Sequence, residues 1–289
     1  MDYLSLRMIS AIFTGMILSQ VGSLTQLSTR NILASPSTLG FDGFSILWIL
    51  VSHSILLYFN IDQSFYILLL SGIPPFLVLG LWFAYFFETH RKVDKLIFMG
   101  LIFGLMVGAI FSLWHFLFLA FNLPFPVELW FGHFRFANSQ SALVLLIAEL
   151  ILMFGWILCR HKMRLFSLGS SFTLNLDLNL KKLCLFIFIS ISLGTFFIIM
   201  LFGSFSFLGL IFPIISRKLW FKKFDVDGEF MLGGFFNGLV LMFVDLLCYL
   251  YPVFGAEIPV GLIATAVGAL SLIIILWKSD NRLEILANR

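Results

Sequence analysis

The stretch GSFSFLGLIFPIISR at residues 203–217, together with the apolar run that leads into it, decides the topology of this chain. Residues 183–216 carry no charged side chain, and these 34 residues as a helix would extend roughly 50 Å, whereas the hydrocarbon core of a bilayer is about 30 Å thick. Basic pairs flank the run at 181–182 and 217–218, and clustered basic residues prefer the cytoplasmic side. The run therefore predicts a hairpin of two spans with both ends inside and a turn near Gly203.

The composition of the 289-residue chain, 61% hydrophobic and 11% charged with a mean hydropathy of +1.06, is typical of a polytopic membrane protein. A soluble helical core is excluded, because runs such as 183–216 leave no polar face for water. We therefore expect an all-α polytopic integral membrane protein with a single transmembrane domain over residues 1–289. The apolar runs predict about nine transmembrane helices, near residues 8–28, 41–59, 64–87, 96–121, 139–159, 183–202, 204–216, 230–252 and 258–277.

The basic residues are unevenly distributed between the loops that these nine spans create. With the ends of the hairpin inside, 16 of the 18 Lys and Arg residues lie on the cytoplasmic side, and Arg7 and Arg135 lie outside. The basic residues form no continuous face for nucleic acid, so no nucleic-acid partner is expected. The cysteines and histidines lack the spacing of a disulfide framework or a metal site, so no metal is expected.

Polar and turn residues in three segments carry a family resemblance. The segment LRMISAIFTGMILSQVGSLTQLSTRNILASPSTLG, residues 6–40, is similar to the second span and following loop of the FecCD-type permeases of ABC importers for iron-siderophore, haem and cobalamin. It matches at Leu6, Arg7, Gly15, Leu18, Gly22, Gln26, Arg30, Asn31, Leu33, Ala34, Pro36, Leu39 and Gly40. The two other segments match at Gly203, Phe207, Gly209, Leu210, Pro213 and Arg217, and at Asp245, Pro252, Glu257, Pro259, Val260, Gly261, Thr265, Ala266 and Gly268.

The chain departs from the family pattern at several positions. Ile9 and Ser10 replace a usual Pro and Arg, Ile214 replaces a usual His, and Tyr249 replaces a usual Arg. In family members a further helix normally precedes the first matching segment, and no such helix precedes it in this sequence. We therefore expect a family-like bundle that lacks the usual first helix.

The resemblance implies the permease subunit of an ABC importer that moves an iron chelate (siderophore) or haem across the bacterial cytoplasmic membrane. The implied partners are a second permease copy or paralogue, two cytoplasmic ATPase subunits and an extracytoplasmic substrate-binding protein. The sequence itself contains no G-x-x-x-x-G-K-[ST] loop to hold nucleotide phosphates. We therefore expect a transport subunit that is not itself an enzyme and has no cofactor of its own, with ATP bound by the partner.

The resemblance also assigns roles to particular residues. The cytoplasmic loop 160–182 is similar to the family segment that docks on the ATPase, so coupling is expected at Ser167, Leu168, Gly169, Phe172 and Leu176. Its apolar residues could instead lie on membrane lipid. Arg7 and Arg135, as outer basic residues, are candidates for docking the binding protein. Translocation or helix packing is expected at Gly100, Gly104, Gly108, Gly203, Phe207, Gly209 and Pro213.

A stripe of glycines lies within the predicted span 96–121. Gly100, Gly104 and Gly108 recur every four residues, and small residues on one helix face let another backbone approach closely. Two interpretations remain open at this point. The stripe is either an ordinary static packing contact or a moving contact beside a substrate path.

Glu149 is the ionisable residue placed most centrally in a predicted span, and such residues are functional candidates. With His53 and His115 behind it, Glu149 suggests a different class of protein, a proton-coupled secondary carrier. The simpler interpretation is that Glu149 is protonated or hydrogen-bonded inside the helix bundle.

Overall fold

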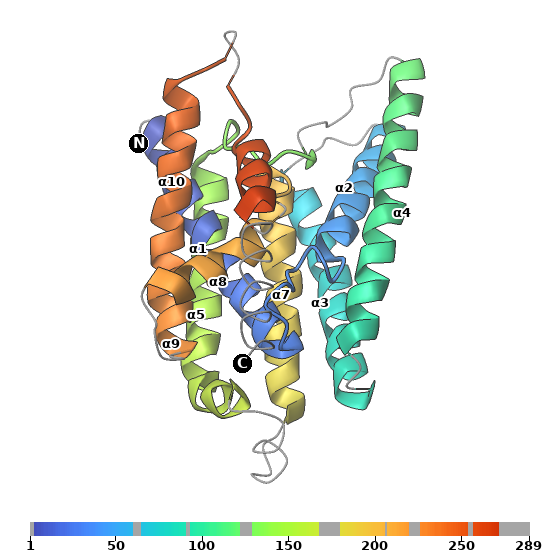
Figure 1. The fold of residues 1–289 in the computed structure, drawn as a ribbon. Helices are drawn as coiled ribbons and strands as arrows, with labels where there is room; N and C mark the ends of the chain where they lie inside the picture. The colour runs from blue at the N-terminus through green and yellow to red at the C-terminus, as the bar shows by residue number, and fades with distance from the viewer. Residues whose placement is uncertain are drawn as a thin grey trace, which may run out of the picture.

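The computed structural model describes residues 3–59, 65–90, 93–121, 129–167, 180–205, 207–219, 226–253 and 257–271, and this part of the chain is built of helices. The helices are α1 (Tyr3–Thr29), α2 (Phe41–Tyr58), α3 (Phe65–His90), α4 (Val93–Ala120), α5 (Ser139–Ser167), α7 (Leu180–Phe202), α8 (Leu208–Leu219), α9 (Val226–Gly228), the π-helical segment η2 (Glu229–Gly233), α10 (Gly234–Leu250) and a terminal helix, Val260–Ser271. The long helices run side by side in one bundle (Figure 1).

Within the described residues, seven helices are long and apolar enough to cross a membrane, if the continuous segment Val226–Leu250 counts as one. The predicted count of nine is therefore approximate. The span expected at 204–216 is represented by α8, which has 12 residues and a length of roughly 18 Å. This length is well below the roughly 30 Å of a bilayer core. The last predicted span is described only as the terminal helix up to Ser271.

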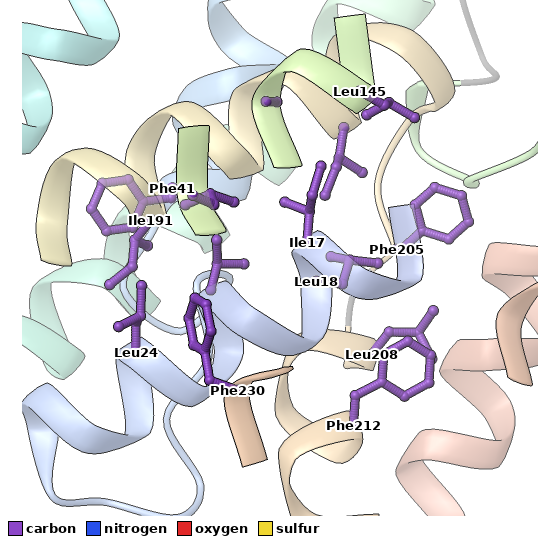
Figure 2. Close-up of a cluster of buried hydrophobic side chains, with 14 of the residues drawn as sticks. Ile17, Leu18, Leu24, Phe41, Leu145, Ile191, Phe205, Leu208, Phe212 and Phe230 are labelled. Carbon is purple, nitrogen blue, oxygen red and sulfur yellow. The ribbon is translucent and has the colours of Figure 1, made fainter. Parts of the chain in front are cut away.

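Helix α1 is the centre of the bundle, because it contacts α10, α8, α5 and α7. Its apolar side chains belong to the main cluster of buried hydrophobic residues, shown in Figure 2 around Ile17, Leu18 and Leu24. Of the residues in its membrane-spanning stretch, 61% are buried, against 11% for α4. The first helix of the described chain and α7 are thus the two most enclosed of these spans, while α4 lies at the edge of the bundle.

Glycines allow α1 to approach its neighbours at backbone distance. A Cβ atom added at Gly15 would lie 2.7 Å from the Cα atom of Gly238 on α10. A Cβ atom added at Gly22 would overlap the carbonyl oxygen of Gly209, just inside α8. Such close approaches exclude any side chain, so both crossings depend on glycine.

The glycine stripe of α4 is only partly a packing contact. A Cβ atom at Gly100 would overlap the carbonyl oxygen of Thr38, so Gly100 packs against the backbone of the α1–α2 connection. A Cβ atom at Gly104 would meet nothing within 4 Å, and one at Gly108 would reach the Trp130 ring at 3.7 Å. Only one of the three predicted positions is a close backbone contact within the described part of the chain.

The connection between α1 and α2 is non-helical, as the sequence predicts. Arg30 has a φ of +51° directly after α1 ends, and Gly40 has a φ of +86° directly before α2 begins. The Asn31 side chain accepts a hydrogen bond from the Leu33 amide at 2.9 Å, so the turn satisfies part of its own polar backbone. Because this segment packs on Gly100, it is held inside the bundle, where non-helical backbone is tolerated.

The turn between α7 and α8 lies where the sequence predicts it. Gly203 has a φ of +83° and its amide donates to the carbonyl of Ile199 at 2.9 Å, which ends α7. Ser204 then pairs with a distant segment: its amide donates to the Leu129 carbonyl at 3.0 Å, and its carbonyl accepts from the Gly132 amide at 2.8 Å. These contacts replace helical hydrogen bonds, so the chain begins α8 only at Leu208.

Candidate functional site

Two clusters of charged residues join helices in the described part of the chain, one toward each end of the bundle. The first cluster surrounds Arg7, whose guanidinium donates from Nε to Asp245 Oδ2 at 2.7 Å and from Nη2 to Asp245 Oδ1 at 2.9 Å. Its Nη1 atom donates to Glu257 Oε2 at 2.8 Å. The guanidinium carbon also lies 4.9 Å from the centre of the Tyr249 ring. This paired fork geometry fixes α1 to α10 and to the segment before the terminal helix.

The position of Arg7 corrects one prediction from the sequence. We expected Arg7 on the outer surface, but its side chain is 2% exposed and its charge is compensated by Asp245 and Glu257. Arg7 is therefore not available at the surface for a docking protein. Arg135 is exposed, and its carbonyl accepts a hydrogen bond from the Tyr3 hydroxyl at 2.9 Å.

The second cluster joins the C-terminal ends of α1 and α8 to η2. Arg217 donates from Nη2 to Gln26 Oε1, and its Nη1 atom lies 3.3 Å from Glu229 Oε1. The Ser23 hydroxyl donates to the same Glu229 oxygen at 2.9 Å. Gln26 also donates to the carbonyl of Leu210 at 2.9 Å, so one amide side chain connects two helices. The cluster forms part of the wall of a cavity of about 520 Å³.

A smaller polar contact lies between the two ends of the bundle. Glu149 is 3% exposed, and its Oε1 atom accepts a hydrogen bond from Gln20 Nε2 at 2.6 Å. Glu149 is therefore hydrogen-bonded to a neighbouring helix, as the simpler interpretation of the sequence required. The proton-coupled carrier is not supported. Asn237 of α10 makes a comparable contact, donating to Ser19 and Ser216 at 2.8 Å each.

The remaining predicted site residues fall in different places. Ser167, expected in the coupling loop 160–182, is the last residue of α5, so residues 160–167 are helical and the loop is shorter than predicted. The other coupling residues, Leu168, Gly169, Phe172 and Leu176, lie outside the described part of the chain. Phe207 has a φ of +69°, and Gly209 packs against Pro36, with a Cβ to Cδ distance of 3.1 Å if a Cβ were added. Pro213 lies inside α8.

The acidic residues that form these contacts are not identified by the sequence analysis. Asp245 and Glu257 appear there only as motif matches, and Asp42 and Glu229 are assigned no function. Asp42 accepts hydrogen bonds from the hydroxyls of Ser37 at 2.9 Å and Ser204 at 3.2 Å. Charges of opposite sign in separate motif segments were the available signal, because a buried charge needs a partner.

Comparison with known proteins agrees with this architecture. The fold resembles that of a solved structure described as an inward-facing conformation of a metal-chelate type ABC transporter, with a TM-score of 0.74 and 22% identity, over 94% of this chain and 85% of that chain. The similarity shows that the two chains share a fold. Together with the sequence relatives, the apolar helices define a multi-pass protein of the bacterial inner membrane.

The sequence comparisons give the family. Residues 1–278 match the FecCD transport family, and the chain belongs to this family. It is 28% identical to the petrobactin import system permease protein YclN of Bacillus subtilis, over 91% of this chain and 81% of that protein. It is 26% identical to the petrobactin import system permease protein FatD of Bacillus anthracis, over 94% of this chain and 79% of that protein. Members of the family are permease subunits of ABC importers.

Proposed function

We propose that this chain is the permease subunit through which an ABC importer carries an iron chelate, a siderophore or haem, across the cytoplasmic membrane. The observation that carries the proposal is the family match over residues 1–278, supported by two relatives named as permeases for petrobactin import. The permease works beside a second permease copy or paralogue, with two cytoplasmic ATPase subunits and an extracytoplasmic binding protein. In this proposal ATP is bound by the ATPase partner, and the permease needs no cofactor of its own.

The proposed mechanism depends on the difference between helices that are tightly joined and a helix that has few buried residues. Helices α1, α8 and α10 are joined by backbone-distance glycine crossings and by ion pairs at both ends, so they form a stiff unit. Helix α4 has few buried residues and is the natural element to move or to contact a second permease. ATP binding and hydrolysis in the partners favour one of two arrangements of the permease pair, and each arrangement opens toward one side.

The coupling assignment predicts that Phe172→Asp releases the ATPase subunits from the permease while the permease stays inserted and folded. Residues 168–179 follow the cytoplasmic end of α5, and their apolar side chains need a protein or lipid partner. The measurement is co-purification of the ATPase subunits with the variant, together with substrate-stimulated ATP hydrolysis. Phe136→Asp, which changes an exposed residue near the opposite end of α5, is the matched control and keeps its ATPase partners. Retention of both properties by Phe172→Asp would place the coupling contact elsewhere.

The exposed outer residue Arg135 carries the second prediction. Arg135→Glu should weaken binding of the substrate-binding protein about twofold to fivefold, because one exposed ion pair contributes at most about 1 kcal/mol. The salt dependence of the association rate should also decrease. Surface plasmon resonance at two salt concentrations measures both quantities. An unchanged affinity and an unchanged salt dependence would remove Arg135 from the docking surface.

A further inference from the structure

The cytoplasmic cavity of about 520 Å³ lies within a single subunit, at the end of the central helix α1. Its walls come from the inner ends of α1, α5 and α8 and from η2. Leu24, Leu27 and Ile214 form part of its apolar surface, and Arg30, Arg217 and Lys218 are its cationic residues among those described. The cavity thus has both an apolar surface and three cationic residues in its described lining.

The charges on this lining do not cancel within the described part of the chain. Glu229 is the one carboxylate among the described lining residues, and it is paired with Arg217 at 3.3 Å. The nearby Asp227 is engaged by Arg164 and by the Trp156 indole. Arg30 and Lys218 have no carboxylate partner among the described residues. The cavity therefore has an excess of positive charge.

One hydrogen-bond donor on the wall is also unsatisfied. The Nε atom of Arg217 is buried and has no hydrogen-bond partner within the described residues, although the two Nη atoms are engaged by Gln26 and Glu229. A buried donor without an acceptor costs about 1–3 kcal/mol, and more when it belongs to a charged group. Because this Nε atom has almost no accessible surface, an anion in the cavity would reach it only after the Arg217 side chain rotates.

The apolar lining limits which kinds of anion fit the cavity. Leu24, Leu27 and Ile214 give the cavity a hydrocarbon surface, while the guanidinium of Arg30 lies 5.7 Å from the centre of the Phe166 ring. A small hydrated ion would leave this surface in contact with water. A guanidinium and an ammonium group together suit a phosphate, which accepts paired hydrogen bonds from arginine.

We propose that this cavity binds a phosphate-bearing anion with an apolar or aromatic part, either the headgroup of an acidic phospholipid from the inner leaflet or a soluble phosphate ester. The phosphate lies between Arg30 and Lys218, on the wall that also contains Arg217. The apolar part contacts Leu27 and Ile214. The cavity wall includes Ser167, an expected coupling residue, but the proposed binding does not depend on which chelate is carried.

The test uses the full-length permease, purified in detergent and stripped of lipid. Phosphatidylglycerol and phosphatidylcholine are titrated as lipid probes and ADP as a soluble phosphate ester, with native mass spectrometry and the thermal unfolding midpoint as readouts. We expect saturable binding of phosphatidylglycerol or of ADP and no binding of phosphatidylcholine. Binding of phosphatidylglycerol alone identifies lipid as the source, and binding of ADP identifies a soluble ester. If neither probe binds, the proposal is wrong.

Two variants locate the bound anion. The double variant Arg30→Gln with Lys218→Gln should weaken binding about tenfold or more, because two charge-assisted contacts are removed. The matched control, Lys95→Gln with Lys181→Gln, removes the same charge from exposed residues that do not line the cavity and should bind as the unaltered protein does. Equal weakening in both variants would mean general surface attraction and would overturn the proposal.

A third variant distinguishes binding inside the cavity from binding at its rim. Leu27→Trp keeps every charge and fills part of the volume, so it should reduce binding of the probe at least as much as the double variant. Circular dichroism and the unfolding midpoint without ligand show whether each variant is folded. Undiminished binding by folded Leu27→Trp would show that the anion lies outside the cavity.

Discussion

Replacing Asp245 with alanine is expected to destabilise the protein by about 3–5 kcal/mol, the usual cost of leaving a buried charge without its partner. Arg7 is 2% exposed and makes both of its fork contacts with Asp245, at 2.7 and 2.9 Å. The remaining carboxylate partner, Glu257, contacts one nitrogen only and is 34% exposed. The measurement is the free energy of unfolding in detergent, followed by circular dichroism.

A second substitution tests the cause of this loss. In the double variant Arg7→Met with Asp245→Leu no buried charge is left unpaired, so it should be more stable than Asp245→Ala. Glu257→Gln should have a small effect, because Glu257 is partly exposed. If Asp245→Ala unfolds like the unaltered protein, the buried ion pair does not hold α1 to α10.

The second large effect is expected at Gly22, where α1 crosses α8. The Cβ atom of Gly22→Ala would overlap the carbonyl oxygen of Gly209, and because this obstacle is backbone, no flexible side chain can move aside. The two helices must separate, so we expect a loss of at least about 3 kcal/mol, at the upper end for overpacking. Thermal unfolding in detergent and the yield of inserted protein measure this loss.

Gly104→Ala is the matched control for Gly22→Ala, since it is the same substitution in the middle of another helix. Its Cβ atom would meet nothing within 4 Å. Because alanine is a better helix former than glycine by about 1 kcal/mol, this variant should be unchanged or slightly more stable. Similar losses in the two variants would mean that the crossing at Gly22 is not limited by backbone contact.

The helical class, most of the spans and the positions of two turns could be predicted from the sequence. Long apolar runs leave few alternatives to a transmembrane helix, and Gly40 and Gly203 mark connections because positive φ angles favour glycine. The single carboxyl group of Glu149 did not obscure its span, since the apolar residues on both sides of it still identify the run.

The residue at which α8 begins after the turn could not be predicted from the sequence. Hydropathy treats residues 204–216 as apolar, whereas the structure begins α8 only at Leu208. The reason is that Ser204 pairs with Leu129 and Gly132, which are distant in sequence. A pattern within one segment carries no information about such partners.

The prediction that Arg7 lies at the surface was wrong for a related reason. A basic residue near the end of a span is usually at the surface, and the topology rule places it there. Its burial depends on Asp245 and Glu257, which are 238 and 250 residues away. Only the pairing of Arg7 with acidic residues in a separate motif could have indicated this burial.

The burial of α1 also has a consequence for synthesis, because α1 cannot complete its packing until α10 has been made. Helix α1 is made before the other described helices, but the residue that neutralises Arg7 follows 238 residues later. At about 5–20 residues per second, the ribosome needs about 10–50 s to go from Arg7 to Asp245. During that time Arg7 and the glycine surface of α1 have no α10 to contact. The nascent chain must therefore keep this helix shielded, in the insertion machinery or against α5 and α7, until α10 emerges.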